Sequence, residues 1–472
     1  MPIPVISVAQ MRDWENASWA AGISSLEVIQ NVGKLIAKRM LELTRSGDSI
    51  ILLAGRGHNG DDARAALPHL ADRHATLINV IDPAQATEML GRLVENRVTD
   101  RQTWFLDGLF GIGLNRQLSD DWIHLINAIN ATDLPALAVD SPSGLNVELG
   151  EPAGAAIRAA VTLTVGAVKA GLLTSRAKPY VGRLEVAPQI GLIERSLTSN
   201  LNWTVAEDFA NFPPRRPVES HKGTYGHLAI FAGSLGYHGA SVLATQGAQR
   251  AQPGLITLWT QPSVYVPVAT HLMAAMAHAW KPAQPLPKSI SGFLIGPGLA
   301  ADELTDEFKN EMRALWRETP LPVVVDASAL DWISSGPTPN HAIRVITPHP
   351  GEAARMLGMP TEHLQANRFD GLRALSCRFG DCWVVLKGHQ TLVGKATSDI
   401  FVNSSGNPFL AQGGSGDILA GYMAGLLAQP SLQADALRTI RFAVWKHGAA
   451  ADQLSASIPN WTPEDLVREL GR

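Results

Sequence analysis

Apolar runs that end in glycine-rich or acidic turns recur through the first 150 residues or so. Ser49–Ala54 is apolar almost throughout, as expected of a strand buried on both faces of a parallel sheet. A glycine-rich turn at 55–60 and a predicted helix over 61–72 follow it. The other elements predicted here are strands over 75–81, 103–106 and 135–139 and a helix near 120–130. This alternation predicts an α/β, Rossmann-like, doubly wound parallel sheet.

The periodicity fades over residues 195–224, where three prolines cluster beside two arginines, and then a second α/β pattern begins. It opens with a predicted strand over 226–231, a glycine-rich turn and a helix that runs through Arg250. Further apolar runs, each ending in a turn, lie at 293–295, 323–325, 345–347 and 383–386. We therefore predict two domains, residues 1–205 and residues 206–472.

Composition limits the classes of function. Of the 472 residues 46% are hydrophobic and 17% charged, which is enough apolar material for large cores, and the formal net charge is only -4. No basic tract indicates a nucleic-acid surface, and no apolar run is long enough to cross a membrane. The first residues lack the pattern of a signal peptide, so we expect a cytoplasmic protein. Cys377 and Cys382 are expected to be buried, reduced thiols.

The sharpest chemical signal is a glycine-rich loop, Ala411-Gln-Gly-Gly-Ser-Gly-Asp417, followed by the helical pattern ILAGYMAGLLAQ. Small residues before a helix let backbone N–H groups approach an anion, and the helix dipole favours negative charge there. The glycines would cost stability if Asp417 were only a helix cap. Asp417 is therefore predicted to accept a proton from a hydroxyl while the loop holds a phosphoryl group.

Similar turns follow the other predicted strands of this half. They are Gly296-Pro-Gly298, Asp326, Pro348-His-Pro-Gly-Glu352 and Lys387-Gly388. Ligands of parallel sheets bind beyond the carboxyl ends of the strands, so these turns should meet. For His349 the alternative is a loop histidine bonded to backbone, and for Lys387 it is a strand cap rather than a phosphate ligand.

Six motifs carry a family resemblance. In order they are SHKGTYGHLAIFAGS, IGPGL, VVDASAL, ITPHPGEAARMLG, VVLKGHQT and NSSGNPFLAQGGSGDILAG. Over residues 206–472 they resemble the NAD(P)H-hydrate dehydratase family, a ribokinase-like branch. The resemblance implies that the S epimer of hydrated NADH or NADPH is phosphorylated on its hydroxyl by ADP with Mg²⁺. Phosphate is then eliminated, and AMP and phosphate are released.

The same resemblance implies roles for single positions of this domain. Ala240, Gly298 and His349 would contact the hydrate, and Asp417 would act as the base on its hydroxyl. The residues that would hold the adenine nucleotide are Lys387, Gly388, His389, Gln390, Thr391 and Gly416. His389-Gln390 departs from the small residues that are common in the family.

Three predicted strand ends of the first half are polar. They are Gly57-His-Asn-Gly-Asp-Asp62, Asp107 within LDGLFGIGL, and Asp140-Ser-Pro-Ser-Gly144. Their oxygens suit a small cation, and the glycine loop at 111–113 allows phosphates to approach. The alternative is ordinary strand-end capping by Asp107 and Asp140.

LAGRGHNGDD, LDGLFGIGL, AVDSPSGLN and LTVGAVKAGL are similar, over residues 1–200, to the NAD(P)H-hydrate epimerase family. This family interconverts the R and S hydrates. The resemblance implies that K⁺ is held by Asn59, Asp107 and Ser143, and that Asp140 contacts the substrate as a candidate acid or base. The other implied substrate contacts are His58, Asn59, Gly60, Asp61, Asp62, Gly111, Ile112 and Gly113.

The loop departs from the family pattern Asn-Asn-Gly-Gly-Asp-Gly at His58, Asp61 and Ala63. Asp61 is expected to be strained if its position requires a positive φ, and its carboxylate to repel a dinucleotide's phosphates. Two alternatives stay open: a ribokinase-type small-molecule kinase, and a first domain that binds without catalysing. The expected partners are small molecules, with no nucleic acid and no membrane, in a homo-oligomer.

Overall fold

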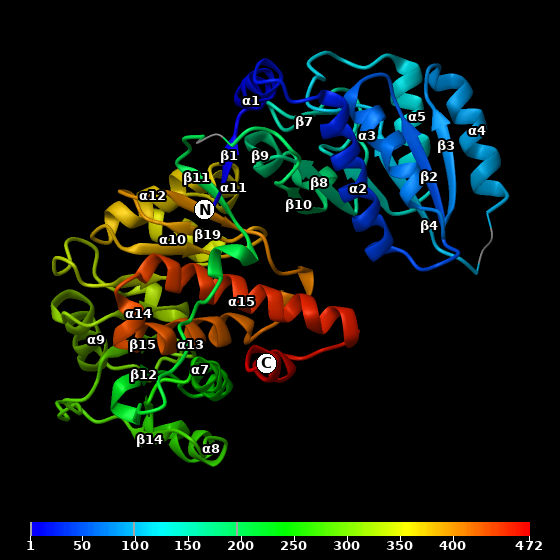
Figure 1. The fold of residues 1–472 in the computed structure, drawn as a ribbon. Helices are drawn as coiled ribbons and strands as arrows, with labels where there is room; N and C mark the ends of the chain where they lie inside the picture. The colour runs from blue at the N-terminus through cyan, green and yellow to red at the C-terminus, as the bar shows by residue number, and fades with distance from the viewer. Residues whose placement is uncertain (1, 98–99, 195–196) are drawn as a thin grey trace. The chain divides into compact units, whose positions relative to one another are not determined.

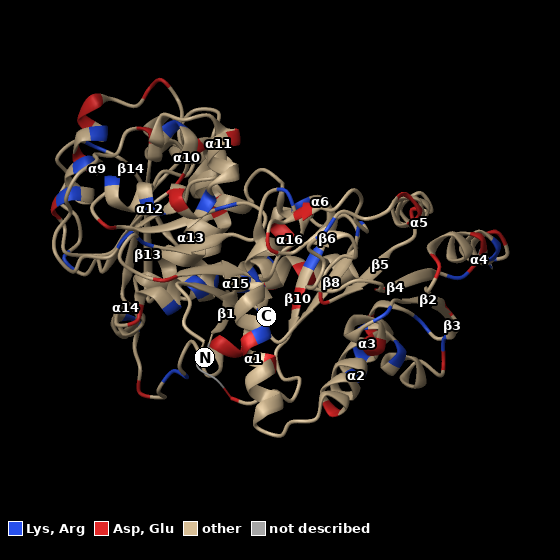
Figure 2. Cartoon of the chain, turned by 90° about the horizontal axis from the view of Figure 1, so that it is seen from above, with Lys and Arg blue, Asp and Glu red and all other residues tan. Residues whose placement is uncertain are grey.

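The computed structural model describes residues 2–97, 100–194 and 197–472, which divide into two compact units, Ile3–Ser199 and Asn200–Arg472 (Figure 1). Both units are built on largely parallel sheets between helices, which confirms the predicted fold class. Positive and negative positions are interspersed in both units (Figure 2). No described helix is long and apolar enough to cross a membrane.

The first unit contains a fully parallel sheet in the order β10-β8-β5-β4-β2-β3. Its strands are β2 (Ser49–Ala54), β3 (His74–Asn79), β4 (Thr103–Gly108), β5 (Ala136–Val139), β8 (Val161–Val165) and β10 (Arg183–Ala187). Short strands β1 (Ile3–Ile6) and β9 (Val168–Lys169) pair in parallel, and β6 (Leu145–Asn146) pairs with β7 (Glu151–Pro152). The helices are α1 (Val8–Ala20), α2 (Ser25–Leu43), α3 (His58–Ala66), α4 (Pro83–Glu95), α5 (Asp120–Asn130) and α6 (Lys178–Val181).

Alternating residues of β2 divide the core of this unit into two layers. Ile50 and Leu52 pack in one buried cluster with residues of α2 and α3. Ile51 and Leu53 pack in the other cluster with residues of α4 and α5. Helices therefore cover both faces of the sheet, as a doubly wound fold requires.

The second unit has the strand order β14-β13-β12-β15-β16-β17-β18-β19-β20-β11. The strands are β11 (Leu201–Thr204), β12 (His227–Phe231), β13 (Leu255–Thr260), β14 (Met276–Ala279), β15 (Gly292–Ile295), β16 (Val323–Val325), β17 (Arg344–Ile346), β18 (Trp383–Leu386), β19 (Leu392–Gly394) and β20 (Ile400–Asn403). From β14 to β18 all neighbours are parallel, whereas β19 is antiparallel to both of its neighbours.

The helices of the second unit are α7 (His238–Ala251), α8 (Tyr265–Thr270), α9 (Asp306–Glu318), α10 (Pro350–Leu357), α11 (Thr361–Ala366), α12 (Arg368–Arg378), α13 (Ser415–Leu427), α14 (Pro430–Gln433), α15 (Ala436–Ser457) and α16 (Pro463–Leu470). Leu228 and Ile230 of β12 pack with α7, α13 and α15 in one cluster. Phe231, with its side chain on the opposite face of β12, contacts Phe308 of α9. Both faces of this sheet are also covered.

Three sequence predictions were wrong in detail. The helix predicted over 61–72 begins at His58, because Gly57 at φ 117° turns the chain directly into the helix, and its α-helical part ends at Ala66. Asp61 lies inside α3 without a positive φ, so the expected backbone strain is absent. Cys377 is exposed rather than buried, whereas Cys382 is buried, and both are free thiols.

Candidate active sites

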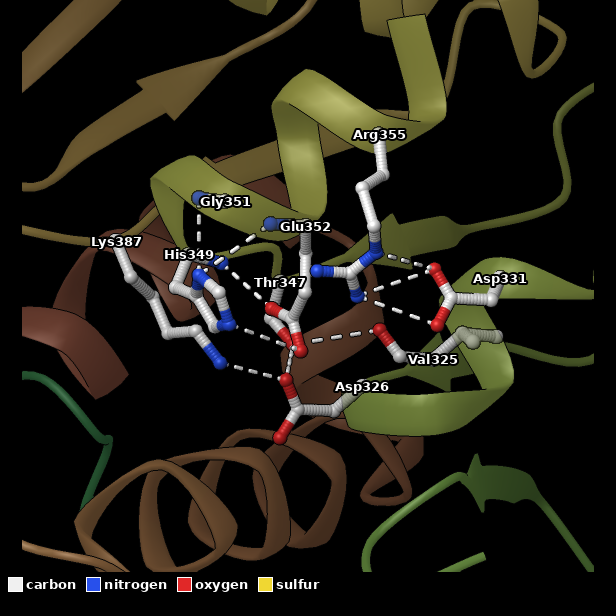
Figure 3. Close-up of polar contacts among 9 residues, drawn as sticks. All are labelled: Val325, Asp326, Asp331, Thr347, His349, Gly351, Glu352, Arg355 and Lys387. Carbon is white, nitrogen blue, oxygen red and sulfur yellow. Dashed lines mark hydrogen bonds and ion pairs between the residues drawn. The ribbon is translucent and has the colours of Figure 1, made fainter. Parts of the chain in front are cut away.

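The predicted residues of the second unit lie where parallel strands end. Because β12, β15, β16, β17 and β18 run in the same direction, the loops that follow them share one edge of the sheet. Figure 3 shows Asp326, Thr347, His349, Glu352 and Lys387 grouped there. The prediction that these turns meet is confirmed for Asp326, His349, Glu352 and Lys387, whereas the contact made by Thr347 was not predicted.

A buried ion pair lies at the centre of this group. The Lys387 ammonium is 2.7 Å from Asp326 Oδ1, which also accepts a 2.6 Å hydrogen bond from the Thr347 hydroxyl. Burial disfavours the charge of Lys387, but Asp326 and Glu352 outweigh it and raise the pKa of this ammonium. Lys387 is therefore a cation at neutral pH, with 19% of its side chain exposed toward solvent.

Asp417 lies in the first turn of α13, three residues after the N-cap Gly414, which has a left-handed conformation. Burial raises the pKa of Asp417 to about 7; Asp326 and Glu352 add to this effect, and Lys387 opposes it. The Lys387 ammonium also lies against the loop, because a Cβ placed on Gly416 would be 3.5 Å from Nζ. Asp417 thus combines a carboxyl that titrates near neutral pH with a helix N-terminus and a cation.

His349 caps α10 through its ring. Its Nδ1 accepts hydrogen bonds from the Gly351 and Glu352 amides at 3.0 and 3.3 Å, while Glu352 Oε2 accepts the His349 amide at 2.7 Å (Figure 3). The alternative prediction, a loop histidine bonded to backbone, is therefore correct for the Nδ1 edge of the ring. Since Nδ1 accepts, the ring proton lies on Nε2, on a side chain that is 53% exposed and can still meet a ligand.

The other implied hydrate contacts, Ala240 and Gly298, lie side by side. A Cβ on Gly298 would be 3.0 Å from that of Ala240 and 2.4 Å from the Tyr237 carbonyl oxygen.

The loop implied for the nucleotide, which follows β18, is hydrogen-bonded to the buried side chain of Arg368. Arg368 donates to the carbonyls of His389 and Leu386 at 2.7 and 3.3 Å, and burial lowers its pKa to about 10.

The remaining nucleotide positions lie in the turn between β18 and β19. Gly388 has φ 123° and Gln390 has φ 53°, and Thr391 closes the turn by donating its hydroxyl to the Gly388 carbonyl at 3.1 Å. The side chain at Gln390 therefore stands on a left-handed backbone, where a small residue such as glycine is favoured.

In the first unit, Asn59, Asp107 and Ser143 meet around the backbone of Phe110. Asn59 donates to the Phe110 carbonyl at 2.8 Å, and Ser143 Oγ accepts the Phe110 amide at 2.8 Å. Asp107 Oδ2 accepts the Ser143 amide at 2.8 Å, in full burial. Burial raises the pKa of Asp107 to about 6, and among the described residues no cationic side chain pairs with it.

Asp140 follows β5 with φ 60° and forms a buried ion pair that sequence reasoning missed. Lys169 Nζ lies 2.5 Å from Asp140 Oδ1 and donates to the Val165 carbonyl at 2.7 Å, and its side chain is completely buried. Thr164 Oγ1 also donates to Asp140 Oδ1, at 3.1 Å. The only signal in the sequence was a single charge within the apolar stretch LTVGAVKAGL.

A third buried carboxyl of this unit is that of Asp62 on α3. Burial raises its pKa to about 8, and the charges of Asp140, Asp61 and Glu15 add to this effect. Glu15, on α1, was also missed, because nothing in its sequence context separates it from a surface glutamate. Asp61 forms an ion pair with Arg64 at 2.9 Å. This pair offsets part of the negative charge of Asp61, which we expected to repel the phosphates of a dinucleotide.

The other loop positions predicted to contact substrate pack closely. A Cβ on Gly60 would be 2.1 Å from the Gly55 carbonyl, and one on Gly111 would be 3.4 Å from the Asn59 side chain. Ile112 packs against the core, and a Cβ on Gly113 would have no neighbour within 4 Å. His58 is the first residue of α3, and its charge lowers the pKa of Glu15.

Fold and sites together define a two-unit α/β enzyme with acid–base groups at the carboxyl ends of both parallel sheets. Residues 228–472 match the family model described as NAD(P)H-hydrate dehydratase, and residues 25–171 match YjeF-related protein N-terminus. The bifunctional NAD(P)H-hydrate repair enzyme Nnr of Coxiella burnetii is 32% identical over 467 residues, 94% of this chain and 93% of the relative. This chain therefore belongs to the family of bifunctional NAD(P)H-hydrate repair enzymes.

Two further similarities extend the comparison. The Vibrio cholerae enzyme of the same name is 35% identical over 365 residues, 76% of this chain and 72% of the relative. The structure of the ADP/ATP-dependent NAD(P)H-hydrate dehydratase from Bacillus subtilis, co-crystallised with ATP and Mg²⁺, is 32% identical with a TM-score of 0.49. That similarity covers 54% of this chain and 91% of the Bacillus chain.

Proposed function

We propose that this chain repairs hydrated NADH and NADPH. Residues 206–472 dehydrate the S epimer at the expense of ADP, and residues 1–205 interconvert the R and S epimers. The observation that carries the proposal is Asp417, whose pKa of about 7 suits a base and which lies at a helix N-terminus beside Lys387.

The dehydration needs a base and an anion site in one place. The Asp417 carboxylate accepts the proton of the substrate hydroxyl while that oxygen takes a phosphoryl group from ADP, which leaves as AMP. The N–H groups at the start of α13 and the Lys387 ammonium stabilise the transferred phosphoryl charge. Phosphate then leaves with the substrate oxygen and takes up the proton that a neighbouring ring carbon loses, and the double bond is restored.

The residues of the second unit fit Mg²⁺ as a companion of the nucleotide. Three carboxyl groups, Asp326, Glu352 and Asp417, face a single cation, Lys387, so the site has an excess of negative charge. Among the described residues no three His, Cys, Asp or Glu side chains form a metal cage. Mg²⁺ would therefore be held mainly by phosphate oxygens, whose charge it would neutralise.

The residues of the first unit fit K⁺. Asp107 is a completely buried carboxyl with no described cation beside it, and Asn59 and Ser143 add neutral oxygens around the same backbone. K⁺ at this position would neutralise Asp107 and fix the loop that begins at Phe110. Because Arg64 pairs with Asp61 and offsets part of its charge, we expect the altered loop to leave the proposed epimerase active.

The test is recovery of NADH absorbance from mixed R and S NADH hydrate with ADP, Mg²⁺ and K⁺. Wild-type chain is compared with Asp417→Asn and with Asp302→Asn, which changes an exposed carboxylate outside the site. We expect complete recovery by wild type and by Asp302→Asn, and a loss of about 10²–10⁴-fold for Asp417→Asn.

Three other outcomes contradict the proposal in distinct ways. Recovery that stalls at the S fraction would mean that the first unit binds without epimerising. A phosphorylated product that accumulates would favour the small-molecule kinase alternative. No recovery with ADP or ATP would refute hydrate repair by this chain.

A further inference from the structure

Three carboxyl groups and one buried ammonium group of the first unit lie within electrostatic range of one another. Asp140 follows β5, Asp62 lies on α3, Glu15 comes from α1 and Lys169 from β9. Their charges act on one another, since Asp140 affects both Asp62 and Glu15, and Lys169 affects Glu15. The contacts of Asp140 and Asp62 differ, and this difference assigns the two carboxyls opposite states.

Asp140 is held as a carboxylate. Its Oδ1 receives hydrogen bonds from Lys169 Nζ at 2.5 Å, the Val165 amide at 3.0 Å and the Thr164 hydroxyl at 3.1 Å. Three donors on one oxygen leave no room for a proton there, and no described residue donates to Oδ2. Lys169 cannot move away, because it also bonds to the Val165 carbonyl and is fully buried. One oxygen of Asp140 thus remains able to accept a proton.

Asp62 has the opposite environment. Its residue is only 9% exposed, and its carboxyl has no hydrogen-bond or ion-pair partner among the described residues. The charged groups that act on it are all negative: Asp140, Asp61 and Glu15. Burial and these charges raise the pKa of Asp62 to about 8, so it carries a proton at neutral pH. Lys169, His58 and Arg12 act on Glu15 instead.

We propose that Asp62 donates and Asp140 accepts the protons exchanged during epimerisation, and that Lys169 is the positioning residue that keeps Asp140 ionised. This inference rests on the proposed epimerase function of the first unit. A neighbouring acid and base whose environments favour opposite protonation states are the arrangement that two-proton chemistry requires.

The chemical step follows from the substrate, whose hydroxyl carbon is bonded to the ring nitrogen. Asp140 takes the hydroxyl proton, the carbon–oxygen double bond forms, and the carbon–nitrogen bond breaks with its electron pair going to nitrogen. Asp62 gives its proton to that nitrogen. After rotation of the open chain, the nitrogen attacks the other face of the carbonyl and returns its proton to Asp62. Asp140 returns its proton to the oxygen, so both residues are restored.

The experiment uses the full chain with K⁺ and without nucleotide, so that dehydration does not consume the substrate. A single purified NADH-hydrate epimer is supplied, and the appearance of the other epimer is followed by chromatography above the spontaneous rate. We expect Asp62→Asn and Asp140→Asn each to lose at least about 100-fold in rate. The control Asp13→Asn changes an exposed carboxylate of α1, two residues from Glu15, and should retain the wild-type rate.

The pH–rate profile separates catalysis from loss of structure. Glu15→Gln removes a negative charge near Asp62, so the alkaline limb of the profile should move to lower pH. Lys169→Met removes the cation beside Asp140, so the protonated form becomes easier to reach and the acid limb should move to higher pH. Lys169→Arg keeps a cation at this position, so its acid limb should lie closer to that of wild type than the limb of Lys169→Met. A merely structural role would lower the rate at every pH without moving either limb.

The outcomes distinguish this inference from the function on which it rests. If wild-type chain does not interconvert the epimers, the proposed function of the first unit is wrong. If wild type is active and Asp62→Asn stays within about threefold of it, or both limbs stay in place in the Glu15 and Lys169 variants, the acid–base assignment is overturned.

Discussion

Replacing Asp417 with asparagine should stabilise the second unit at alkaline pH while it lowers the rate of dehydration by about 10²–10⁴-fold. In the folded chain, burial raises the pKa of Asp417 from an ordinary 3.8 to about 7, and Asp326 and Glu352 outweigh Lys387 in the same direction. The ionised form of Asp417 therefore destabilises the folded state. Asparagine has nearly the same shape and no charge to bury.

The magnitude follows from the two protonation equilibria. Between pH 3.8 and about 7 the folded chain binds a proton at Asp417 that the unfolded chain has lost, so stability falls as pH rises through this window. Above it the full difference corresponds to at most about 4 kcal/mol. Because the site is partly solvated, we expect Asp417→Asn to gain about 2–4 kcal/mol at pH 8 and about a third as much at pH 5.

Thermal unfolding of wild type and variant at pH 5, 6, 7 and 8 tests this reasoning. A gain of about 2–4 kcal/mol should raise the Tm of the second unit by roughly 4–12 °C at pH 8. Asp302→Asn, at an exposed position, is the control and should leave the Tm unchanged. Equal stability at pH 8, or a gain that grows toward acid pH, would refute the argument.

Three other substitutions have defined outcomes. Lys387→Met should weaken ADP binding tenfold or more in calorimetry and cost about 3 kcal/mol in urea denaturation, because Asp326 is left buried without a cation. Gly298→Ala places a Cβ 2.4 Å from the Tyr237 carbonyl, so the KM for the hydrate should rise about tenfold while ADP affinity is unchanged. Asp107→Asn should remove the stimulation of epimerisation by K⁺ over Na⁺, and an equal K⁺ response in both proteins would contradict its role.

Much of the fold could be predicted because buried parallel strands are continuous apolar runs. The strands at 323–325 and 383–386 match β16 and β18, and the helix near 120–130 matches α5. The start of α3 could not be predicted, because it depends on the backbone conformation of Gly57, which the residue type permits but does not require. The exposure of Cys377 was missed because it depends on which face of α12 packs against the sheet.

Some residues of the two candidate sites could be predicted from the sequence and others could not. Asp107, Asp140 and Asp326 could be located from the sequence because each directly follows or ends an apolar strand, and parallel strands align their carboxyl ends. Lys169 could not, since its partner lies 29 residues earlier and its only trace is one charge in an apolar stretch. Glu15 is brought in by a helix outside the strand–helix alternation, so tertiary structure alone places it near Asp62.

Two units with unrelated strand orders use the same electrostatic arrangement. In each, a lysine pairs with a strand-end aspartate, Lys169 with Asp140 and Lys387 with Asp326, while a second aspartate on a neighbouring helix is left without a cation of its own. Burial raises the pKa of that second carboxyl, to about 8 for Asp62 and about 7 for Asp417. The ion pair keeps the strand-end aspartate negatively charged, and this charge helps to raise the pKa of the second carboxyl toward neutral pH. In the proposed dehydration the second carboxyl, Asp417, accepts the hydroxyl proton. In the proposed epimerisation the paired Asp140 accepts it and Asp62 protonates the ring nitrogen, so one arrangement supplies the acid–base groups of both reactions.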